Sequence, residues 1–216
     1  MTVNDIKKAA VIGCGTMGNG IAQVFATTGY DVRLIDIDQK YLDKAVATID
    51  KSLDRFVKKE KITEEDKKTA LAHIETSTEL LDAKDCQIVI EAITEDLDIK
   101  LKVWKQLEEA CPAEAIFASN TSSLPITQLA AATNRPAQFI GMHFMNPVPI
   151  MKLVEVIRGI ATSDETSAAI VEMTNKLGKT PVEVNDFPGF VSNRILMPMI
   201  NEAIYAVMEG VAEPEA

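Results

Sequence analysis

Apolar and polar positions are arranged most distinctly near the start of the chain, where an apolar run breaks into closely spaced glycines and then resumes at helical spacing. Residues 8–12 form the apolar run, and the following segment places an apolar stripe on one helical face: Met17, Ile21, Val24 and Phe25. This order predicts a buried strand, a tight turn and a helix over residues 16–28 that ends at Gly29. The next apolar run, residues 31–36, predicts a second buried strand.

The glycines of this turn have the spacing G-x-G-x-x-G, at Gly13, Gly15 and Gly18. In a dinucleotide site the first permits the turn, the second lets the backbone approach a pyrophosphate, and the third allows the helix to pack closely on the strand. Asp36 lies roughly 20 residues further on, where a carboxylate would bind the adenosine ribose. A strand-end aspartate that caps the next helix is the alternative for Asp36 alone, but the complete unit favours a nucleotide site.

Helical and strand patterns alternate along most of the remaining chain. Helices are predicted over residues 41–59, 64–72, 98–110 and 163–177, apolar strands over residues 86–93 and 115–119, and a further strand over residues 180–186. This alternation predicts an α/β fold with a Rossmann-like, doubly wound, mostly parallel sheet. Ligands of such sheets bind beyond the carboxyl ends of the strands, so we expect residues 92–100 and 120–123 to border the site.

Two further strands, over residues 138–143 and 152–158, are joined by a bend that is too short for a crossover helix, so we expect an antiparallel pair. Glu155 shares a strand face with apolar neighbours and therefore needs a polar partner, which His143 on the other strand would supply. Such a pair is either a base with its orienting carboxylate or a structural ion pair, and these two residues alone do not decide between them. His73, the other histidine of the chain, is expected at the surface.

One flank of the helix predicted over residues 41–59 carries Ser52, Arg55 and Lys59. A hydroxyl and two cations could hold the phosphates of a ligand. The residues alone favour the commoner explanation, a solvated charged face.

The pattern changes at the segment F-P-G-F, after which residues 190–208 predict a long apolar helix. We therefore predict a dinucleotide-binding domain over residues 1–186 and the beginning of a helical domain over residues 187–216.

Composition narrows the class of protein. The 216 residues carry a net charge of −10 without an arginine-rich segment, so a general nucleic-acid surface is not expected. No apolar run approaches the roughly 20 residues of a membrane span, and the N-terminus lacks the apolar core of a signal peptide. Cys14, Cys86 and Cys111 form no metal-ligand pattern and are expected to be reduced, as in a cytoplasmic protein.

Five segments together resemble a known family: G-C-G-T-M-G-N-G-I-A-Q-V-F-A, E-A-I-T-E-D-L-D-I-K, S-N-T-S-S-L, H-F-M-N-P-V-P-I-M-K-L-V-E-V and F-P-G-F-V-S-N-R. They are similar to the 3-hydroxyacyl-CoA dehydrogenases, and most of all to the bacterial members that act on 3-hydroxybutyryl-CoA. The resemblance extends from the first strand to about Met208. The segment that begins at His143 is far more specific than the glycine spacing.

The resemblance implies roles for individual residues. It makes His143 the catalytic base or acid and Glu155 its orienting partner, and it implies that Ser122 and Asn193 contact the C3 oxygen of the substrate. The positions implied on the cofactor side are Gly13, Gly15, Thr16, Met17, Gly18, Asp36, Glu95, Lys100 and Asn120. Those implied on the side of the CoA substrate are Ser52, Lys59, Ser122, Asn146 and Asn193, which reverses the preference for a solvated flank.

The reaction implied by the resemblance is hydride transfer between C3 of an (S)-3-hydroxyacyl-CoA and the nicotinamide of NAD, with His143 removing or returning the hydroxyl proton. Asp36 favours NAD over NADP because its charge would repel a 2′-phosphate. One alternative is a Rossmann dehydrogenase of another small hydroxy acid, which would use a catalytic lysine in the helical domain. The other is a non-catalytic NAD-binding relative, which is disfavoured because all four catalytic side chains are present.

Members of this family continue beyond the helix that carries Asn193 into further helices, which complete the substrate cleft and most of the dimer contact, whereas this sequence ends at Ala216. The resemblance therefore implies a truncated form, with a homodimer expected when the helical domain is complete. We expect the last helix to carry an exposed apolar stripe: Leu196, Met199, Ile200, Ile204 and Val207.

Overall fold

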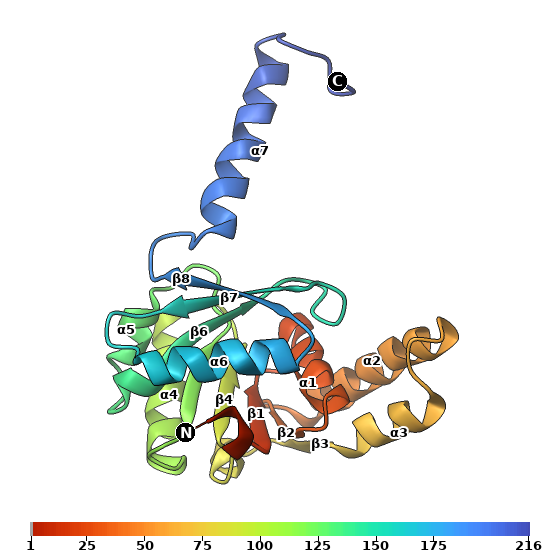
Figure 1. Cartoon of the computed structure of the whole chain (residues 1–216), viewed down its shortest axis with the longest axis vertical. Coiled ribbons are helices and arrows are strands. Elements are labelled where there is room, and N and C mark those ends of the chain that lie inside the picture. Colours follow the sequence, from red (N-terminus) through yellow and green to blue (C-terminus); the bar gives the residue numbers. More distant parts are fainter. Residues whose placement is uncertain (1) are drawn as a thin grey trace.

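The computed structural model describes residues 2–216 and places eight strands in one sheet with helices packed on both of its faces (Figure 1). The strands are β1 (Lys8–Ile12), β2 (Asp31–Ile35), β3 (Ile74–Ser77), β4 (Ile88–Glu91), β5 (Ile116–Ser119), β6 (Phe139–Phe144), β7 (Leu153–Arg158) and β8 (Thr180–Asn185). The helices are α1 (Thr16–Thr27), α2 (Gln39–Lys58), α3 (Glu64–Ala72), α4 (Leu97–Ala110), α5 (Ile126–Ala130), α6 (Asp164–Lys176) and α7 (Ser192–Met208).

The strand order across the sheet is β3-β2-β1-β4-β5-β6-β7-β8. All neighbouring pairs are parallel except β6 and β7, which are antiparallel, so β7 and β8 run opposite to the rest. The predicted Rossmann-like, mostly parallel sheet is confirmed, and so is the antiparallel pair. The order reverses between β1 and β4, which is where ligands of such sheets bind.

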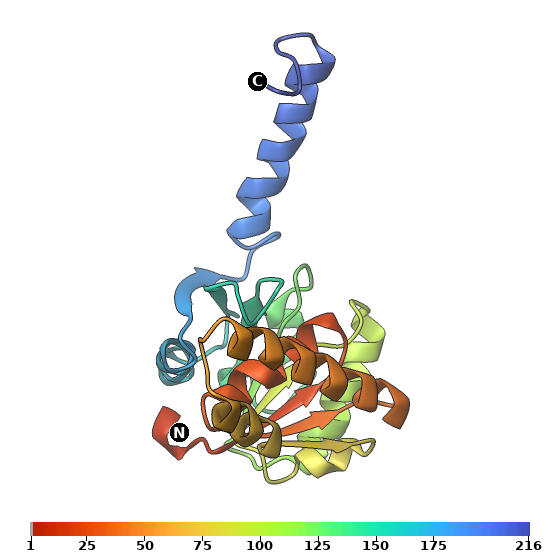
Figure 2. The same ribbon diagram turned by 90° about the vertical axis from the view of Figure 1, so that its right-hand side faces the viewer.

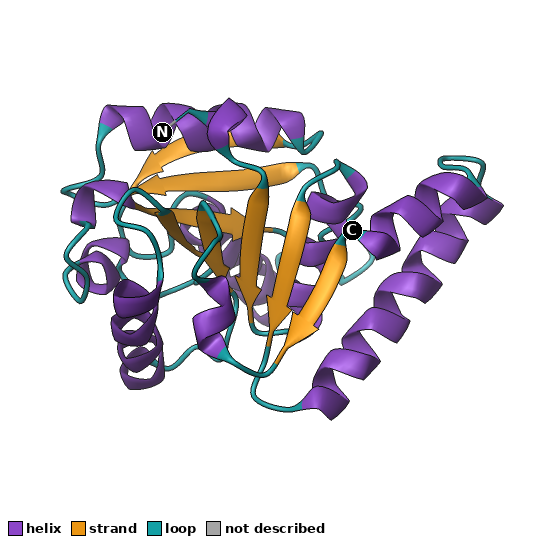
Figure 3. Cartoon of the chain, turned by 90° about the horizontal axis from the view of Figure 1, so that it is seen from below, coloured by secondary structure: helices purple, strands orange, loops and turns teal. Residues whose placement is uncertain are grey.

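Helices lie on both faces of the sheet (Figure 3), and because alternate residues of each strand point to opposite faces, the apolar core is divided in two. One half lies under α1, α2, α3 and α6, and Figure 2 shows α2 and α3 in front of the sheet. The other half lies under α4 and α5. In that half the ring of Trp104 lies 4.9 Å from Phe117 and 4.8 Å from Phe139, measured between centroids.

Several helices begin at a side chain that accepts a backbone N–H of the first turn. Asp38 starts α2, Asp96 starts α4 and Ser163 starts α6 in this way. At α3, Thr63 and Asp66 cap each other reciprocally. These caps explain why the helix boundaries follow closely from the sequence pattern.

The structure differs from the sequence-based expectations at three places in the sheet domain. Strand β3 was not predicted, because three of its four residues are polar and it lies at the edge of the sheet. On α4 the apolar Ile99, which helical spacing placed on the buried face, is exposed, whereas the charged Lys100 is buried. Helix α5 was not predicted, because its five residues are too few to show a helical period. His73 lies at the surface as expected, partly exposed, with Nδ1 2.7 Å from Oδ1 of Asp31.

The glycine turn between β1 and α1 has the geometry that the spacing predicts. Gly13 has φ of +94°, which a residue with a side chain rarely adopts. A Cβ atom at Gly18 would lie 1.7 Å from the carbonyl oxygen of Gly13, so only glycine allows α1 to pack this closely on the end of β1. At Gly15, by contrast, a Cβ atom would meet open space.

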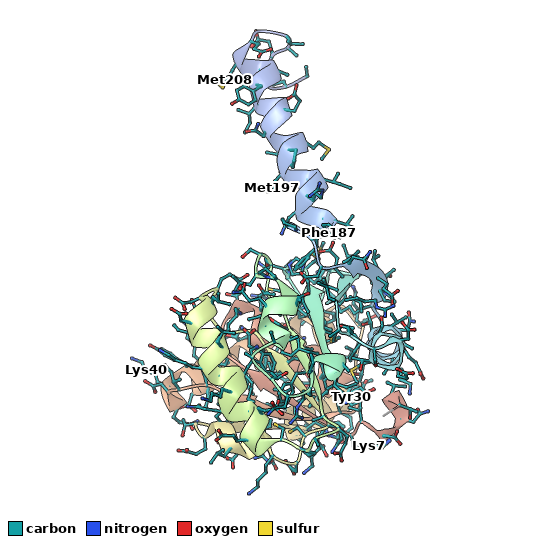
Figure 4. All side chains as sticks on the ribbon, turned by 90° about the vertical axis from the view of Figure 1, so that its left-hand side faces the viewer. Lys7, Tyr30, Lys40, Phe187, Met197 and Met208 are labelled. Carbon is teal, nitrogen blue, oxygen red and sulfur yellow. The ribbon has the colours of Figure 1, made fainter. Side chains whose placement is uncertain are left out.

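Helix α7 extends away from the sheet domain, and its side chains point outward on all sides (Figure 4). None of its residues is buried, and Met197 and Met208 are among the exposed apolar side chains. The apolar stripe expected on this helix is exposed as well. None of the helices within residues 2–216 is both long enough and apolar enough to span a membrane.

We predict that Gly18→Ala lowers the free energy of unfolding by about 1–3 kcal/mol, the usual cost of forced overpacking. The sign of this change in stability distinguishes overpacking from helix propensity, because replacing glycine by alanine inside a helix ordinarily stabilises the protein by about 1 kcal/mol. Urea denaturation measures the change. Gly15→Ser is the matched control, since its side chain enters open space at the helix N-cap, and its stability should remain within about 0.5 kcal/mol of the wild type.

Candidate active site

His143 and Glu155 face each other directly across the antiparallel strands β6 and β7. Imidazole Nδ1 lies 2.9 Å from Oε2 of Glu155, and both side chains are buried. A carboxylate only accepts hydrogen bonds, so Nδ1 carries the proton and Nε2 is left with its lone pair. Nε2 lies 3.0 Å from Oγ of Ser122, whose hydroxyl can donate to it. Ser122 is exposed and therefore marks the solvent end of this chain of groups.

The second carboxylate oxygen of Glu155 holds the start of α7. Oε1 accepts the backbone N–H groups of Val191 at 3.0 Å and of Ser192 at 2.8 Å. Burial raises the pKa of Glu155, but the hydrogen bonds from His143 and from these amides outweigh it, and the net pKa lies below the ordinary value. Glu155 is therefore an anion near neutral pH and can stabilise an imidazolium at His143.

Phe190 covers the imidazole and was not anticipated as a site residue. Its ring centroid lies 5.7 Å from that of His143, and the residue is buried with φ of +49°. A non-glycine residue at positive φ is uncommon and often occurs at functional sites. The sequence signal is the segment F-P-G-F, which marks the predicted domain boundary and belongs to the family resemblance but by itself assigns no role to Phe190.

Glu95 organises the loop that carries Ser122. Its Oε1 accepts the backbone N–H of Ser122 at 2.9 Å and of Ser123 at 3.0 Å, and it is also bonded to the hydroxyls of Thr121 and Ser123. Burial raises the pKa of Glu95, but these hydrogen bonds and the nearby charge of Lys100 have the larger effect in the opposite direction. The net pKa is about 2, below the ordinary value. Glu95 thus fixes the loop from one side and keeps its negative charge at all ordinary pH values.

Lys100 lies between two carboxylates beneath this loop. Its ammonium pairs closely with Glu91 and lies 3.3 Å from Oε2 of Glu95. Glu91 also accepts the hydroxyl of Ser119 at 2.7 Å and the N–H of Ile93 at 2.9 Å. Lys100 is 1% exposed. It is therefore placed to neutralise this group of acids rather than to reach a ligand directly.

A cavity of about 1160 Å³ opens at the carboxyl ends of β1, β2 and β4. The glycine turn, the inner flank of α2, residues 92–94 and residues 146–149 form its wall. The expectation for residues 92–100 is met at this wall by Ala92, Ile93, Thr94 and Ile99, whereas residues 120–123 are not part of it. The hydrogen-bonded residues Ser122, His143 and Glu155 do not line the cavity either. The lining residue nearest to them in sequence is Asn146, three residues after His143.

Asp36 lies on the cavity wall beside the glycine turn. Its Oδ2 accepts the N–H of Cys14 at 2.7 Å, and its Oδ1 accepts the N–H of Ile37 at 2.8 Å. These two bonds fix the carboxylate at the mouth of the cavity. Burial together with the neighbouring carboxylate raises the pKa of the Cys14 thiol to about 12, and all three cysteines of the chain are free and buried.

The part of the cavity wall that α2 forms is cationic, although the protein as a whole is acidic. Ser52 and Arg55 line the cavity, together with Lys44 and Lys51, which had no predicted role. Lys59 is exposed beyond the end of α2 and does not line it. Three positive charges on one flank can attract and bind an anionic ligand group.

The remaining residues implied by the resemblance occupy different settings. Thr16 and Asn146 line the cavity, whereas Met17 packs half-buried against the core. Asn120 is buried and its Oδ1 accepts the N–H of Phe144 at 2.9 Å, which ties the loop after β5 to β6. Asn193 is half-buried in the first turn of α7, next to Ser192.

Comparison with protein families places these features in context. Residues 8–187 match the family model described as "3-hydroxyacyl-CoA dehydrogenase, NAD binding domain", and residues 189–216 match that of the C-terminal domain of the same enzymes. A probable 3-hydroxybutyryl-CoA dehydrogenase of Deinococcus radiodurans is 59% identical over 209 residues, covering 97% of this chain and 75% of the relative. A 3-hydroxybutyryl-CoA dehydrogenase of Bradyrhizobium diazoefficiens is 53% identical over 98% of this chain and 72% of the relative.

Solved structures agree with the sequence comparison. The crystal structure of (S)-3-hydroxybutyryl-CoA dehydrogenase from Ralstonia eutropha matches with a TM-score of 0.95 and 54% identity, covering 97% of this chain and 74% of that one. The 3-hydroxybutyryl-CoA dehydrogenase of Escherichia coli matches with a TM-score of 0.95 and 40% identity over 97% of this chain and 44% of that chain.

We predict that Glu95→Gln flattens the acid limb of the stability profile. The folded-state pKa of Glu95 lies near 2 and the ordinary value is 4.5, so between these pH values the unfolded state binds more protons and stability rises with pH. The stabilisation is complete above pH 4.5 and is lost as the pH falls through 2. Urea midpoints measured from pH 2 to 5 should rise less in the variant than in the wild type.

Glu109→Gln is the control for this measurement. Glu109 is exposed at the C-terminal end of α4, the opposite end of the helix from Glu95. Its substitution should leave the profile parallel to that of the wild type. A Glu95→Gln profile equally parallel to the wild type would contradict the role assigned to Glu95.

Proposed function

The chain belongs to the 3-hydroxyacyl-CoA dehydrogenase family and carries its NAD-binding domain, and we propose that it interconverts (S)-3-hydroxybutyryl-CoA and acetoacetyl-CoA with NAD(H). The observation that carries this proposal is the chain of polar groups Ser122–His143–Glu155. It supplies a base whose unprotonated nitrogen is hydrogen-bonded to an exposed hydroxyl and which is oriented by a buried anion. A carbonyl–alcohol interconversion needs a proton acceptor and donor of this kind.

The residues of the glycine turn fit a dinucleotide. Gly15 stands at the N-cap of α1 with open space in front of it, so a pyrophosphate can approach the backbone N–H groups at the start of the helix. Asp36, fixed by its two backbone hydrogen bonds, is placed to accept hydrogen bonds from ribose hydroxyls. NAD, when bound here, supplies hydride acceptance and donation.

The protein's own residues handle the proton. In the oxidation direction Nε2 of His143 accepts the proton of the substrate hydroxyl as the hydride leaves C3, and Glu155 stabilises the resulting imidazolium. In the reduction direction the same nitrogen returns the proton to the carbonyl oxygen. The Ser122 hydroxyl, 3.0 Å from Nε2, is placed to hydrogen-bond the C3 oxygen of the substrate during oxidation and during reduction. Asn193 is proposed as the second residue that contacts this oxygen.

The cationic flank of α2 is proposed to bind the phosphates of CoA. Ser52, Lys51 and Arg55 line the cavity, which supports this assignment. Lys59, also proposed from the family resemblance, lies one turn beyond them on the exposed end of the helix. Asn146 would contact the ligand from the other side of the cavity.

The proposal extends to the association of the chain. We propose a homodimer formed through the region of α7, and the exposure of the apolar side chains on that helix supports it. The proposed setting is the cytoplasm.

Turnover of acetoacetyl-CoA with NADH tests the proposed reaction directly. NADH oxidation should depend on acetoacetyl-CoA and yield the (S) alcohol. Absence of turnover together with normal binding of NADH would refute the substrate, and absence of both would refute the proposed function as a whole.

We predict that His143→Ala and Glu155→Gln each lower kcat by about 10² to 10⁴ while leaving the Kd for NADH nearly unchanged. Glutamine keeps an oxygen for the amides of Val191 and Ser192, so the start of α7 remains attached, but it removes the anion that stabilises the imidazolium. The two losses should not add in the double variant, because Glu155 acts through His143. Near-normal kcat in either single variant would make the pair structural.

We predict that Asp36→Asn reduces the preference for NADH over NADPH by at least about tenfold, measured as the ratio of the two kcat/KM values. Asparagine keeps one acceptor for the Cys14 amide but removes the charge that repels a 2′-phosphate. The wild type should strongly prefer NADH. A wild type that uses both cofactors equally would contradict the assignment of Asp36.

A further inference from the structure

One wall of the cavity is formed by the irregular segment between β6 and β7, and the proposed mechanism does not explain how this segment is held in position. Residues 145–152, here called the β6–β7 loop, connect the strand of His143 to the strand of Glu155. Residues 146–149 of this loop line the cavity opposite the start of α1. The position of the loop therefore sets the space that is available to a ligand bound at the glycine turn.

One side of the β6–β7 loop is fixed by packing against α1. Val148 is buried, and a Cβ atom added to Gly20 would lie 2.8 Å from the Cβ of Val148. The turn itself is closed by Pro147, whose carbonyl accepts the N–H groups of Ile150 at 3.0 Å and Met151 at 2.9 Å. These contacts leave the carbonyl groups of Val148 and Met151 directed elsewhere.

Both of these carbonyls are bound by Lys179. Its ammonium donates a close hydrogen bond to the carbonyl of Val148 and another, of 2.8 Å, to that of Met151. Lys179 lies between α6 and β8, and it follows Gly178, whose φ of +69° ends the helix. A single side chain from a distant part of the sequence thus holds two points of the loop.

The chemistry of this contact is unusual for a purely structural lysine. Lys179 is 8% exposed, and no carboxylate within residues 2–216 pairs with it. Burial, aided by repulsion from Lys152, lowers its pKa to about 8. A buried ammonium without a counter-ion is costly, and an apolar side chain would fill the same space more cheaply. What the ammonium adds is directed, charge-assisted bonding to two carbonyls.

We propose that Lys179 is a positioning residue, which holds the β6–β7 loop against the cavity so that the loop closes over the bound dinucleotide and sets the affinity for NAD(H). The proposal rests on the proposed function only in taking this cavity as the dinucleotide site. Lys179 does not itself touch the ligand. It acts through the backbone of Val148 and Met151.

The first experiment compares Lys179→Met with the wild type in a fluorescence titration with NADH at pH 7. Methionine keeps the length of the side chain but cannot donate, so the two carbonyls lose their partner and the loop is released. We expect the Kd for NADH to rise at least about tenfold, with the fold retained by circular dichroism. Lys176→Met is the matched control, because Lys176 is exposed at the C-terminal end of α6, three residues before Lys179, and the Kd of this variant for NADH should not change.

The second experiment uses a variant with little risk of misfolding. Below about pH 8 Lys179 is charged, and as the pH rises through 8 its hydrogen bonds lose their charge assistance, so the affinity for NADH should fall. Lys152 is the one charged group of the described chain that acts on this pKa. Lys152→Met removes this repulsion, together with the 3.2 Å hydrogen bond that Nζ of Lys152 donates to the carbonyl of Gly178, and the alkaline fall in NADH affinity should move to higher pH.

The outcomes separate this inference from the proposed function. A wild type that does not bind NADH would refute the function. A wild type that binds NADH, together with a folded Lys179→Met protein of unchanged Kd, would refute the positioning role alone. If Lys179→Met does not fold, an alkaline limb that Lys152→Met leaves in place would refute it in the same way.

Discussion

The arrangement of the site depends on one buried carboxylate. Glu155 has lost nearly all contact with water, and a buried anion is stable only if its oxygens are fully hydrogen-bonded. The imidazole of His143 satisfies one oxygen and the backbone at the start of α7 satisfies the other. A single electrostatic requirement therefore fixes the tautomer of the histidine, the pairing of β6 with β7 and the point at which the last helix leaves the sheet domain.

The same physical device recurs beneath the loop that carries Ser122. Glu95 gathers the amides and hydroxyls of that loop, and the ammonium of Lys100 compensates the charges of Glu95 and of the fully buried Glu91. Each reactive side chain is thus positioned by a carboxylate that does not itself react. On the cavity wall the sign is inverted, since an ammonium at Lys179 holds carbonyl groups in place. Preorganised charges of this kind position groups without reorganisation during the reaction.

Sequence patterns predicted the features that have a local signature. The glycines of the turn, the apolar periodicity of the helices and the antiparallel pair of His143 with Glu155 all follow from spacing along the sequence. The prediction failed where a residue's position is determined by a partner that is distant in sequence or by a backbone group. Strand β3 forms because it pairs with the edge of β2, and Lys100 is buried because it pairs with two carboxylates. The amides at the start of α7 belong to the backbone, so no residue type in the sequence indicates their contact with Glu155.

The attachment of α7 has a consequence for how this chain tolerates substitution. Because the groups that bind Glu155 are the backbone amides of residues 191 and 192, almost any side chain at these two positions leaves the bond intact. Proline is the exception, although the first turn of a helix usually accepts it well. Substitutions of Val191 or Ser192 should therefore keep the two backbone hydrogen bonds of this junction, provided that neither residue becomes proline.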